Sequence, residues 1–225
     1  MRLWVRTWQA VFFLVLVEAP GAQRKAVSVL SRPVSHFSIG QTTVLDALLW
    51  LGHDERVCFG IEFQGPELGR NVRVATDRTT LSEVVKEILG SSNAYQLSIS
   101  DGVILVRKKG LKPPSWLDHR LPQFVLPRTE LMSANNVLWM TLERDLNPSM
   151  GGVAGDFPPT DPIDEVGPFR EHGQTVRQLL IRIVSSSRGA SWFPTTNGVG
   201  VPFPGSVDRF WTLVTYSGSH AIRPK

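Results

Sequence analysis

The chain has 225 residues, of which 42% are hydrophobic and 20% are charged. This is the composition of a globular protein, and it excludes a chain disordered throughout, a collagen-like repeat and a coiled coil. The single cysteine excludes an internal disulfide framework and a zinc site built on several cysteines. The net charge of +4 is too small to indicate a nucleic-acid partner.

Residues 1–22 have the organisation of a secretory signal peptide. Arg2 and Arg6 precede an apolar run over residues 10–17, and Glu18 and several small residues follow it. A membrane-spanning helix needs about 20 apolar residues, and this run reaches about half that length. The pattern therefore favours export over a membrane anchor.

Cleavage of this signal is expected between Ala22 and Gln23, with the segment 19–21 as the alternative position. The removed segment holds two arginines and one glutamate, so the net charge falls from +4 to +3. The exported chain then keeps one thiol, Cys58, which has no second cysteine to pair with inside the chain. Its apolar surroundings at 57–61 favour a buried small hydrophobe over a reactive or intermolecular thiol.

Residues 34–107 show strand and helix patterns in the order β-α-β-β-α-β-β. Alternating or apolar stretches predict strands at 34–39, 58–63 and 71–76, and a hairpin at 95–107 that turns at Asp101-Gly102. One helix is expected from a cap at Thr42 or Thr43 to Gly52, and a second from Thr79 or Thr80 to Gly90. Glu83 stands in capping-box spacing to Thr80.

Residues 108–128 combine basic residues with four prolines, which predicts a solvated linker in preference to a surface for anionic lipid. A short strand at 123–126 is the one element expected within it. A second, divergent domain is then expected over residues 129–217. Its helices are predicted at 133–146 and 175–187, its strands at 190–193 and 209–216, and a long loop at 147–173.

The helices that begin near Thr80 and Thr175 share one apolar pattern at an offset of 95 residues. Any two amphipathic helices share such spacing, but here two predicted strands follow each helix. Two interpretations therefore stay open, a divergent structural repeat and two unrelated amphipathic helices of the same spacing. The matched positions are Leu81, Val84, Val85, Ile88 and Leu89 in the first half, and Val176, Leu179, Leu180, Ile183 and Val184 in the second.

Residues 34–107 resemble the secretin and TonB N-terminal short domain, the STN domain. The resemblance is carried by the strand around Phe37, the helix starts at 43–48 and 79–89, the strand at 72–74, and the hairpin with Asp101-Gly102. It covers about a third of the chain and implies a small α+β module of helices on a sheet. Proteins of this family bind other proteins, often through a sheet edge, and the resemblance transfers no catalytic residue.

The sequence contains no strong motif of an enzyme active site. The five histidines include no HExxH pair, no nucleophile elbow is present, and no glycine-rich phosphate loop opens a helix. His53-Asp54-Glu55 is interpreted as a solvated turn in preference to a metal site. We therefore assign no catalytic residue, no metal ligand and no cofactor from the sequence.

Two features keep alternative functions open. Five acidic residues crowd the segment 156–171, and they favour a solvated loop over a carboxylate-based hydrolase or a calcium site: Asp156, Asp161, Asp164, Glu165 and Glu171. Trp192 and Trp211 fall on predicted strands, where core packing is favoured over an aromatic surface for glycan.

The sequence therefore predicts an α+β protein, a βαββαββ module followed by a second divergent domain. The signal-like segment predicts export, and the STN resemblance implies a non-catalytic protein-interaction module in the periplasm or envelope of a Gram-negative-type bacterium. The expected partner is an envelope protein, with a glycan as the alternative ligand, no nucleic acid, and peripheral membrane contact at most. Val103, Leu105 and Arg107 are the predicted partner-binding residues, on the condition that their strand has a free edge.

Overall fold

The structure is a computed structural model that describes residues 29–63, 65–90, 93–146, 165–187, 189–195 and 210–214. Helices and strands alternate along the chain, which confirms the mixed α+β class. The expected signal segment 1–22, with its cleavage site between Ala22 and Gln23, lies outside the described residues. So do Asp156, Asp161 and Asp164 of the acidic segment.

The first half has the predicted element order. Its elements are β1 (Pro33–Thr43), α2 (Val44–Glu55), β2 (Cys58–Ile61), β3 (Asn71–Thr80), α3 (Leu81–Leu89), β4 (Tyr95–Ser100) and β5 (Val103–Lys108), with a 3-10 turn at Pro66–Gly69. The hairpin between β4 and β5 turns at Asp101 and Gly102, whose φ angles of 48° and 81° are those that a two-residue hairpin turn requires.

The second half begins with a 3-10 turn at Ser115–Asp118. Its elements are β6 (Arg120–Leu126), β7 (Thr129–Glu130), α4 (Leu131–Leu146), β8 (Glu165–Val166), β9 (Phe169–Thr175), α5 (Val176–Ser185), β10 (Ser191–Thr195) and β11 (Phe210–Val214). The predicted helices at 133–146 and 175–187 and the last two strands are confirmed to within a few residues. The stretch 147–173 that we had interpreted as a loop contains β8 and the first five residues of β9.

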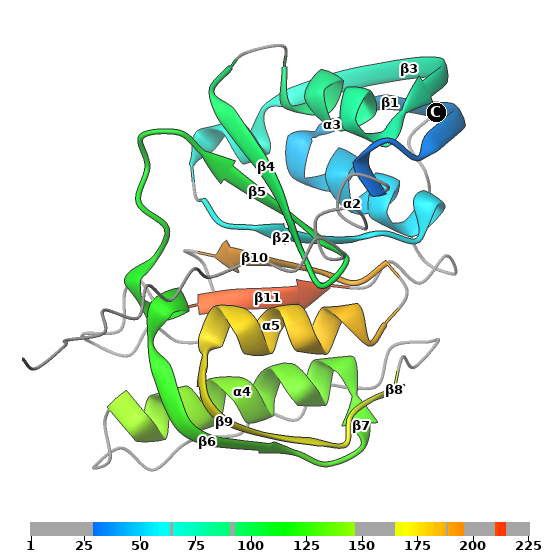
Figure 1. Ribbon diagram of the computed structural model, residues 1–225. Helices are drawn as coiled ribbons and strands as arrows, with labels where there is room; N and C mark the ends of the chain where they lie inside the picture. Colours follow the sequence, from blue (N-terminus) through cyan, green and yellow to red (C-terminus); the bar gives the residue numbers. More distant parts are fainter. Residues whose placement is uncertain are drawn as a thin grey trace, which may run out of the picture.

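Five layers make up the fold (Figure 1). A central sheet has the strand order β11-β10-β2-β5-β4, and it takes strands from both halves. Helices α2 and α3 cover one face of this sheet, and the antiparallel ribbon β1–β3 covers those helices. Helices α5 and α4 lie on the other face, with the ribbon β6–β9 outside them.

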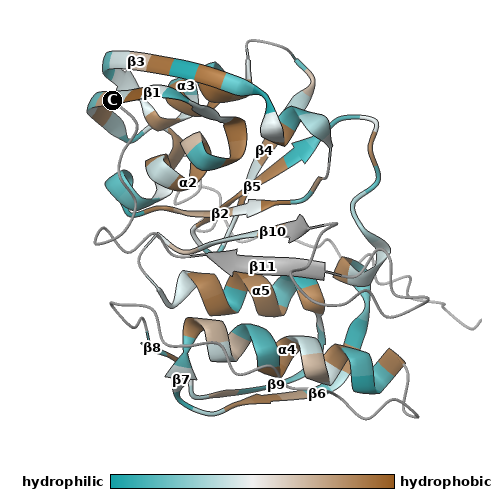
Figure 2. Cartoon of the chain, turned by 180° about the vertical axis from the view of Figure 1, so that it is seen from behind, coloured by the Kyte–Doolittle hydropathy of each residue, from teal (hydrophilic) through white to brown (hydrophobic). Residues whose placement is uncertain are grey.

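The central strands are apolar on both faces because each face adjoins a separate core. Along β5, Ile104 and Val106 pack into the core of the first half, whereas Val103 and Leu105 pack into that of the second half. Figure 2 shows hydrophobic residues on β2 and β5 and on the helices that flank them. A continuous apolar run is the pattern expected of a strand buried on both faces.

Residues 108–128 are not the solvated linker that their composition predicted. β6 pairs with β9 in antiparallel register from Arg120↔Thr175 to Leu126↔Phe169. The apolar side chains between the prolines are buried, namely Trp116, Leu117, Leu121, Phe124 and Leu126. Pro122 fits because β6 is an edge strand, where the lack of an N–H leaves no partner unpaired.

The helix caps explain where the helices begin. Thr43 caps α2, and Thr80 caps α3 through a capping box with Glu83, as predicted. Gly52, in contrast, does not end α2, which continues to Glu55. A Cβ atom at Gly52 would lie 2.9 Å from the carbonyl oxygen of Val57, so glycine is needed there for close approach of the backbone.

The described elements of the two halves correspond to each other, as the repeat interpretation requires. Thr175 caps α5 through a capping box with Gln178, as Thr80 does for α3 with Glu83. The ribbons β1–β3 and β6–β9 match, and so do the hairpins β4–β5 and β10–β11. Among the described residues, β2 has no counterpart in the second half.

Glu83 makes the first capping box sensitive to pH, whereas Gln178 leaves the second insensitive. Hydrogen bonds from Thr79 and Thr80 lower the pKa of Glu83. Its contribution to stability is therefore complete above the unfolded-state pKa of about 4.3 and is lost as the pH falls through the lower folded-state value. We expect Glu83→Gln to be destabilising at neutral pH and to differ less from the wild type near pH 3.

Urea unfolding measured across this acidic range tests that expectation. Gln178→Ala is the control, because an amide does not titrate and its effect should be the same at every pH. A difference between wild type and Glu83→Gln that stays constant with pH would contradict the expectation.

Candidate functional site

The predicted partner-binding residues lie on β5, and the condition placed on them is not met. β5 pairs with β2 on one side, in parallel, and with β4 on the other, antiparallel. The strand therefore has no free edge. Val103 and Leu105 are 0% and 4% exposed and belong to the core of the second half, so this face of β5 already binds a segment of the same chain.

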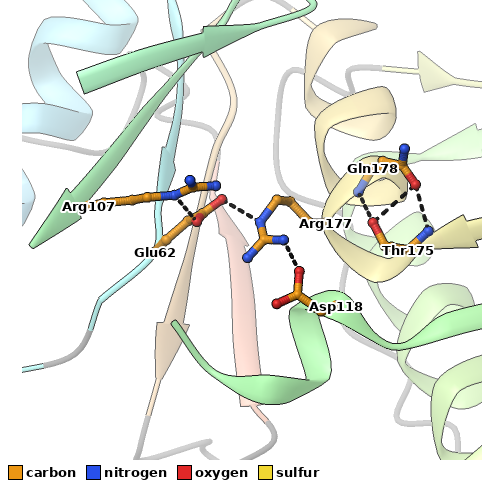
Figure 3. Close-up of polar contacts among 6 residues, drawn as sticks. All are labelled: Glu62, Arg107, Asp118, Thr175, Arg177 and Gln178. Carbon is orange, nitrogen blue, oxygen red and sulfur yellow. Dashed lines mark hydrogen bonds and ion pairs between the residues drawn. The ribbon is translucent and has the colours of Figure 1, made fainter. Parts of the chain in front are cut away.

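Arg107, the third predicted residue, bonds a buried carboxylate between the two halves (Figure 3). Its Nε atom donates to Oε2 of Glu62 at 2.5 Å, and the Glu62 side chain is 0% exposed. Glu62 follows β2, where alternate residues point to opposite faces. Ile61 and Phe63 enter the first core, and Glu62 points toward the second half.

Arg177 completes this cluster from the first turn of α5. Its Nε donates to Oε1 of Glu62 at 2.7 Å, and its guanidinium also bonds Asp118 of the 3-10 turn. Burial alone would lower the pKa of Arg177, but the bonds to Asp118 and Glu62 raise it above the ordinary value. The positive charge is thus held between two carboxylates near the N-terminus of α5, where anions are favourable.

We name Glu62, Arg107, Asp118 and Arg177 the junction cluster. It joins β2 and β5 of the first half to α5 and the 3-10 turn of the second. The charged groups of its members bond one another, so the cluster is a structural junction between the halves. Sequence reasoning missed Glu62, although a charged residue between Ile61 and Phe63 in an apolar strand was a usable signal.

Among the described residues, the central sheet ends at β11 on one side and at β4 on the other, and the outer edge of β4 is unpaired. In the described part of the chain, β4 pairs with β5 alone and stands at the end of the strand order. The N–H of Lys109 donates to the carbonyl oxygen of Ala94 at 2.7 Å, which makes 94 and 109 a hydrogen-bonded pair. Because such pairs alternate along an antiparallel ladder, the backbone N–H and C=O groups of Tyr95, Leu97 and Ile99 face outward.

The side chains of the same three residues form a half-buried apolar row. Tyr95, Leu97 and Ile99 pack against the first core at the margin of the sheet, and the Tyr95 ring lies 5.4 Å from that of Phe63 between centroids. An added strand would bury the remaining surface of this row. We call the outward backbone groups and this row together the β4 edge.

The β4 edge lacks the features that usually protect a free strand. Its six residues, YQLSIS, include no charged residue and no proline, and the β4–β5 register has no bulge. The other strands with a free edge and described side chains are protected in the part of the chain that the structure covers. β1 has a bulge and Pro33, β6 has Arg120 and Pro122, and β3 and β9 are charged.

A cavity of about 340 Å³ lies at the opposite end of β2, beside Arg32, Arg56 and Cys58. The Cys58 thiol is buried and donates to the carbonyl oxygen of Val184 at 3.1 Å, which confirms the interpretation of a buried small residue. Arg32 bonds Glu55. The hydroxyls of Ser185 and Ser187 donate to carbonyls of α5, so the lining residues do not converge on a reacting group.

The described residues of the acidic segment and the His53-Asp54-Glu55 stretch do not converge on a site. Glu165 pairs with Arg128, and Glu171 lies 3.9 Å from Arg182, so each has a separate basic neighbour. No group of three potential metal ligands occurs among the described residues. His53 Nδ1 lies 3.2 Å from Asp54 Oδ1 at the end of α2, in the last turn of a helix and not in the predicted solvated turn.

The alternative of an aromatic surface formed by Trp192 and Trp211 fails at Trp192. Trp192 is 0% exposed and belongs to the second core, where its ring lies against Gly60. Trp211 is in β11, whose side chains lie outside the described part of the structure. Core packing is thus confirmed for Trp192, and glycan binding by a pair of exposed rings is not supported.

Comparison of the chain with family models, with curated proteins and with solved structures found no match in any of the three. Within the described ranges, the helices are too short or too polar to cross a bilayer. The β4 edge is the surface that the geometry of the described residues singles out.

Proposed function

We propose that this protein is an exported, non-catalytic interaction module of the cell envelope. It binds an extended segment of another protein along the β4 edge. The observation that carries the proposal is the row of outward backbone groups at Tyr95, Leu97 and Ile99, backed by half-buried apolar side chains. An incoming strand would pair with these groups and cover the side chains, which is the mode known as strand addition.

The molecule itself contains an example of the same edge in use. β10 stands in the second half where β4 stands in the first, because each is the first strand after a capped helix and pairs antiparallel with the next strand. The other edge of β10 pairs with β2, in parallel, through Ser191↔Phe59 and Trp192↔Gly60. The corresponding edge of β4 is the one left free in the described structure.

The resemblance of residues 34–107 to the STN domain and the signal-like N-terminus support an envelope location and a protein partner. The order β1-α2-β2-β3-α3-β4-β5 agrees with the module that the resemblance implies. In this proposal the second half covers one face of the first module and leaves its β4 edge to the partner.

Two variants at one position separate strand addition from other binding modes. Leu97→Pro removes the outward N–H without breaking a bond to β5, since that N–H faces away from β5. Leu97→Ala loses the same apolar packing but keeps the N–H, and so serves as the matched control. We expect the tagged full-length chain and Leu97→Ala to capture the same envelope protein after cross-linking. Leu97→Pro should capture at least tenfold less of that protein.

Mass spectrometry of the cross-linked peptides gives the readout, and circular dichroism checks that both variants are folded. Cross-links between the partner and residues 93–101 would support the proposal. Equal capture by Leu97→Pro, or no protein above background with the wild type, would overturn it.

A further inference from the structure

We infer that the β4 edge also accepts a second copy of this chain, so that two central sheets join across a two-fold axis at Leu97. This inference rests on the proposed use of the β4 edge for strand addition. It commits to an antiparallel arrangement in which Leu97 lies opposite Leu97 of the other copy and Tyr95 lies opposite Ile99.

Self-pairing is compatible with the ladder geometry of β4. The outward backbone groups belong to residues 95, 97 and 99, which are symmetric about 97. An antiparallel copy centred on Leu97 therefore places outward groups opposite outward groups along the whole strand. A shift by one residue would oppose outward groups with inward ones and would lose these bonds.

The side chains are complementary in the same register. Tyr95, Leu97 and Ile99 all lie on the face of the first core. A two-fold axis normal to the sheet keeps that face on the same side in both copies, so the two apolar rows become continuous. The pairs formed would be one Leu–Leu pair and two aromatic–β-branched pairs, which are favourable cross-strand neighbours.

Charge favours the antiparallel direction. Lys109 lies beside one end of β4, opposite Ala94, and Asp101 lies at the other end. An antiparallel copy brings the Asp101 end of one chain to the Lys109 end of the other. A parallel copy would bring like charges together at both ends, and like charges oppose association.

Because β4 carries no charged residue, a second copy of the strand can approach it without repulsion between like charges. Its six residues carry no lysine, glutamate or proline that would hinder the approach of an identical strand. Monomeric proteins usually place such residues on their free edges, as β3 and β9 do here. An unprotected edge with a self-complementary register fits a two-fold interface.

Sedimentation of the purified full chain tests the association without any envelope partner. We expect a dimer that dissociates on dilution through the micromolar range, retained by Leu97→Ala with weaker affinity. Leu97→Pro, which lacks the outward N–H, should dimerise with an affinity at least tenfold lower than that of Leu97→Ala. A monomer at all concentrations, or a dimer equally strong in Leu97→Pro, would overturn the inference.

Cysteine cross-linking tests the register. Leu97→Cys should give a disulfide-linked dimer on mild oxidation, since directly opposed residues have Cα atoms about 5.5 Å apart, within disulfide reach. Ser98→Cys should cross-link poorly alone, because residue 98 faces residue 96 of the other copy, and the double variant Gln96→Cys/Ser98→Cys should cross-link well. The wild type is the control, since Cys58 is buried. Equal cross-linking by Leu97→Cys and Ser98→Cys would overturn the register.

The outcomes separate this inference from the proposed function. A monomeric chain that still captures an envelope protein in the Leu97→Ala form and loses it as Leu97→Pro would refute self-association and leave the proposed function standing. A dimer of the expected register without any captured envelope protein would support the inference and refute the envelope partner.

Discussion

Replacing Arg177 by leucine should destabilise the protein by about 3 kcal/mol, because it removes one of two cations that hold a buried carboxylate. The Glu62 side chain is 0% exposed and would keep only Arg107 as a charged partner. Arg177 also neutralises Asp118, so its loss leaves the 3-10 turn and α5 unconnected at this point. Urea unfolding of the purified chain measures the effect.

Two comparisons test whether the loss comes from the orphaned charge. Arg128→Leu removes a cation from the exposed pair with Glu165, where the side chains are 71% and 53% exposed, and should cost under about 1 kcal/mol. The double variant Glu62→Leu/Arg177→Leu should cost less than the two single changes added together. Additive losses would show that the junction cluster does not act as a unit.

Replacing Trp192 by alanine should destabilise the protein by about 3–5 kcal/mol, the usual range for removal of a buried large aromatic side chain. Trp192 is fully buried and stands opposite Gly60 in the parallel pair of β10 and β2. Its loss would leave a cavity at the strand pairing that joins the two halves. Thermal and urea unfolding measure the change, and one transition for both halves is expected.

The close contact at Gly60 offers a second test of this packing. A Cβ atom on Gly60 would lie 2.7 Å from Cδ2 of Leu105 and 2.8 Å from the Trp192 ring, so Gly60→Ala should be destabilising in the wild type. It should cost less in the Trp192→Ala background, because only the contact with Leu105 then remains. Val125→Ala, at a position 43% exposed on β6, is the control and should change stability by about 0.5 kcal/mol or less. Equal effects of Trp192→Ala and Val125→Ala would contradict the described core.

Both predictions concern contacts that unite the two halves into one body. β10 pairs with β2 across the halves, and the junction cluster bridges the same region from the side of α5. Separate domains on a flexible linker would unfold in two transitions and would tolerate changes at this boundary. The shared sheet instead predicts cooperative unfolding of the described elements.

Local patterns in the sequence were sufficient for most of the elements. Threonine was predicted at each of these helix starts, at 42 or 43, at 79 or 80 and at 175. Thr43, Thr80 and Thr175 are the caps observed, because a threonine oxygen satisfies backbone N–H groups whatever the tertiary context. The Asp101-Gly102 hairpin likewise depends on two adjacent φ angles alone. The strand β6 was harder to predict, since Arg120 and Pro122 lie on exposed positions of an edge strand and hide the pattern of buried residues around them.

The candidate site depended on pairing that no local pattern reveals. The run Val103-Ile104-Leu105-Val106 is equally compatible with an edge strand in a core and a central strand between two cores. The structure shows the second arrangement, so that on this side of the sheet the described strand with an unpaired edge is β4 and not β5. Glu62 and Arg177 are 115 residues apart in the sequence. They are in contact only because α5 packs on the sheet to which β2 belongs.

Side-chain periodicity and hydrogen bonds within a few residues were sufficient to predict the α+β class, the capped helices, the hairpin and the repeated helix pattern. Three features became visible only in the folded chain: which strand edges are unpaired among the described residues, which face of β5 is covered, and that the two halves share one sheet. Those features arise from strand pairing and burial between distant segments. Their free energy depends on both segments together and cannot be inferred from either one alone.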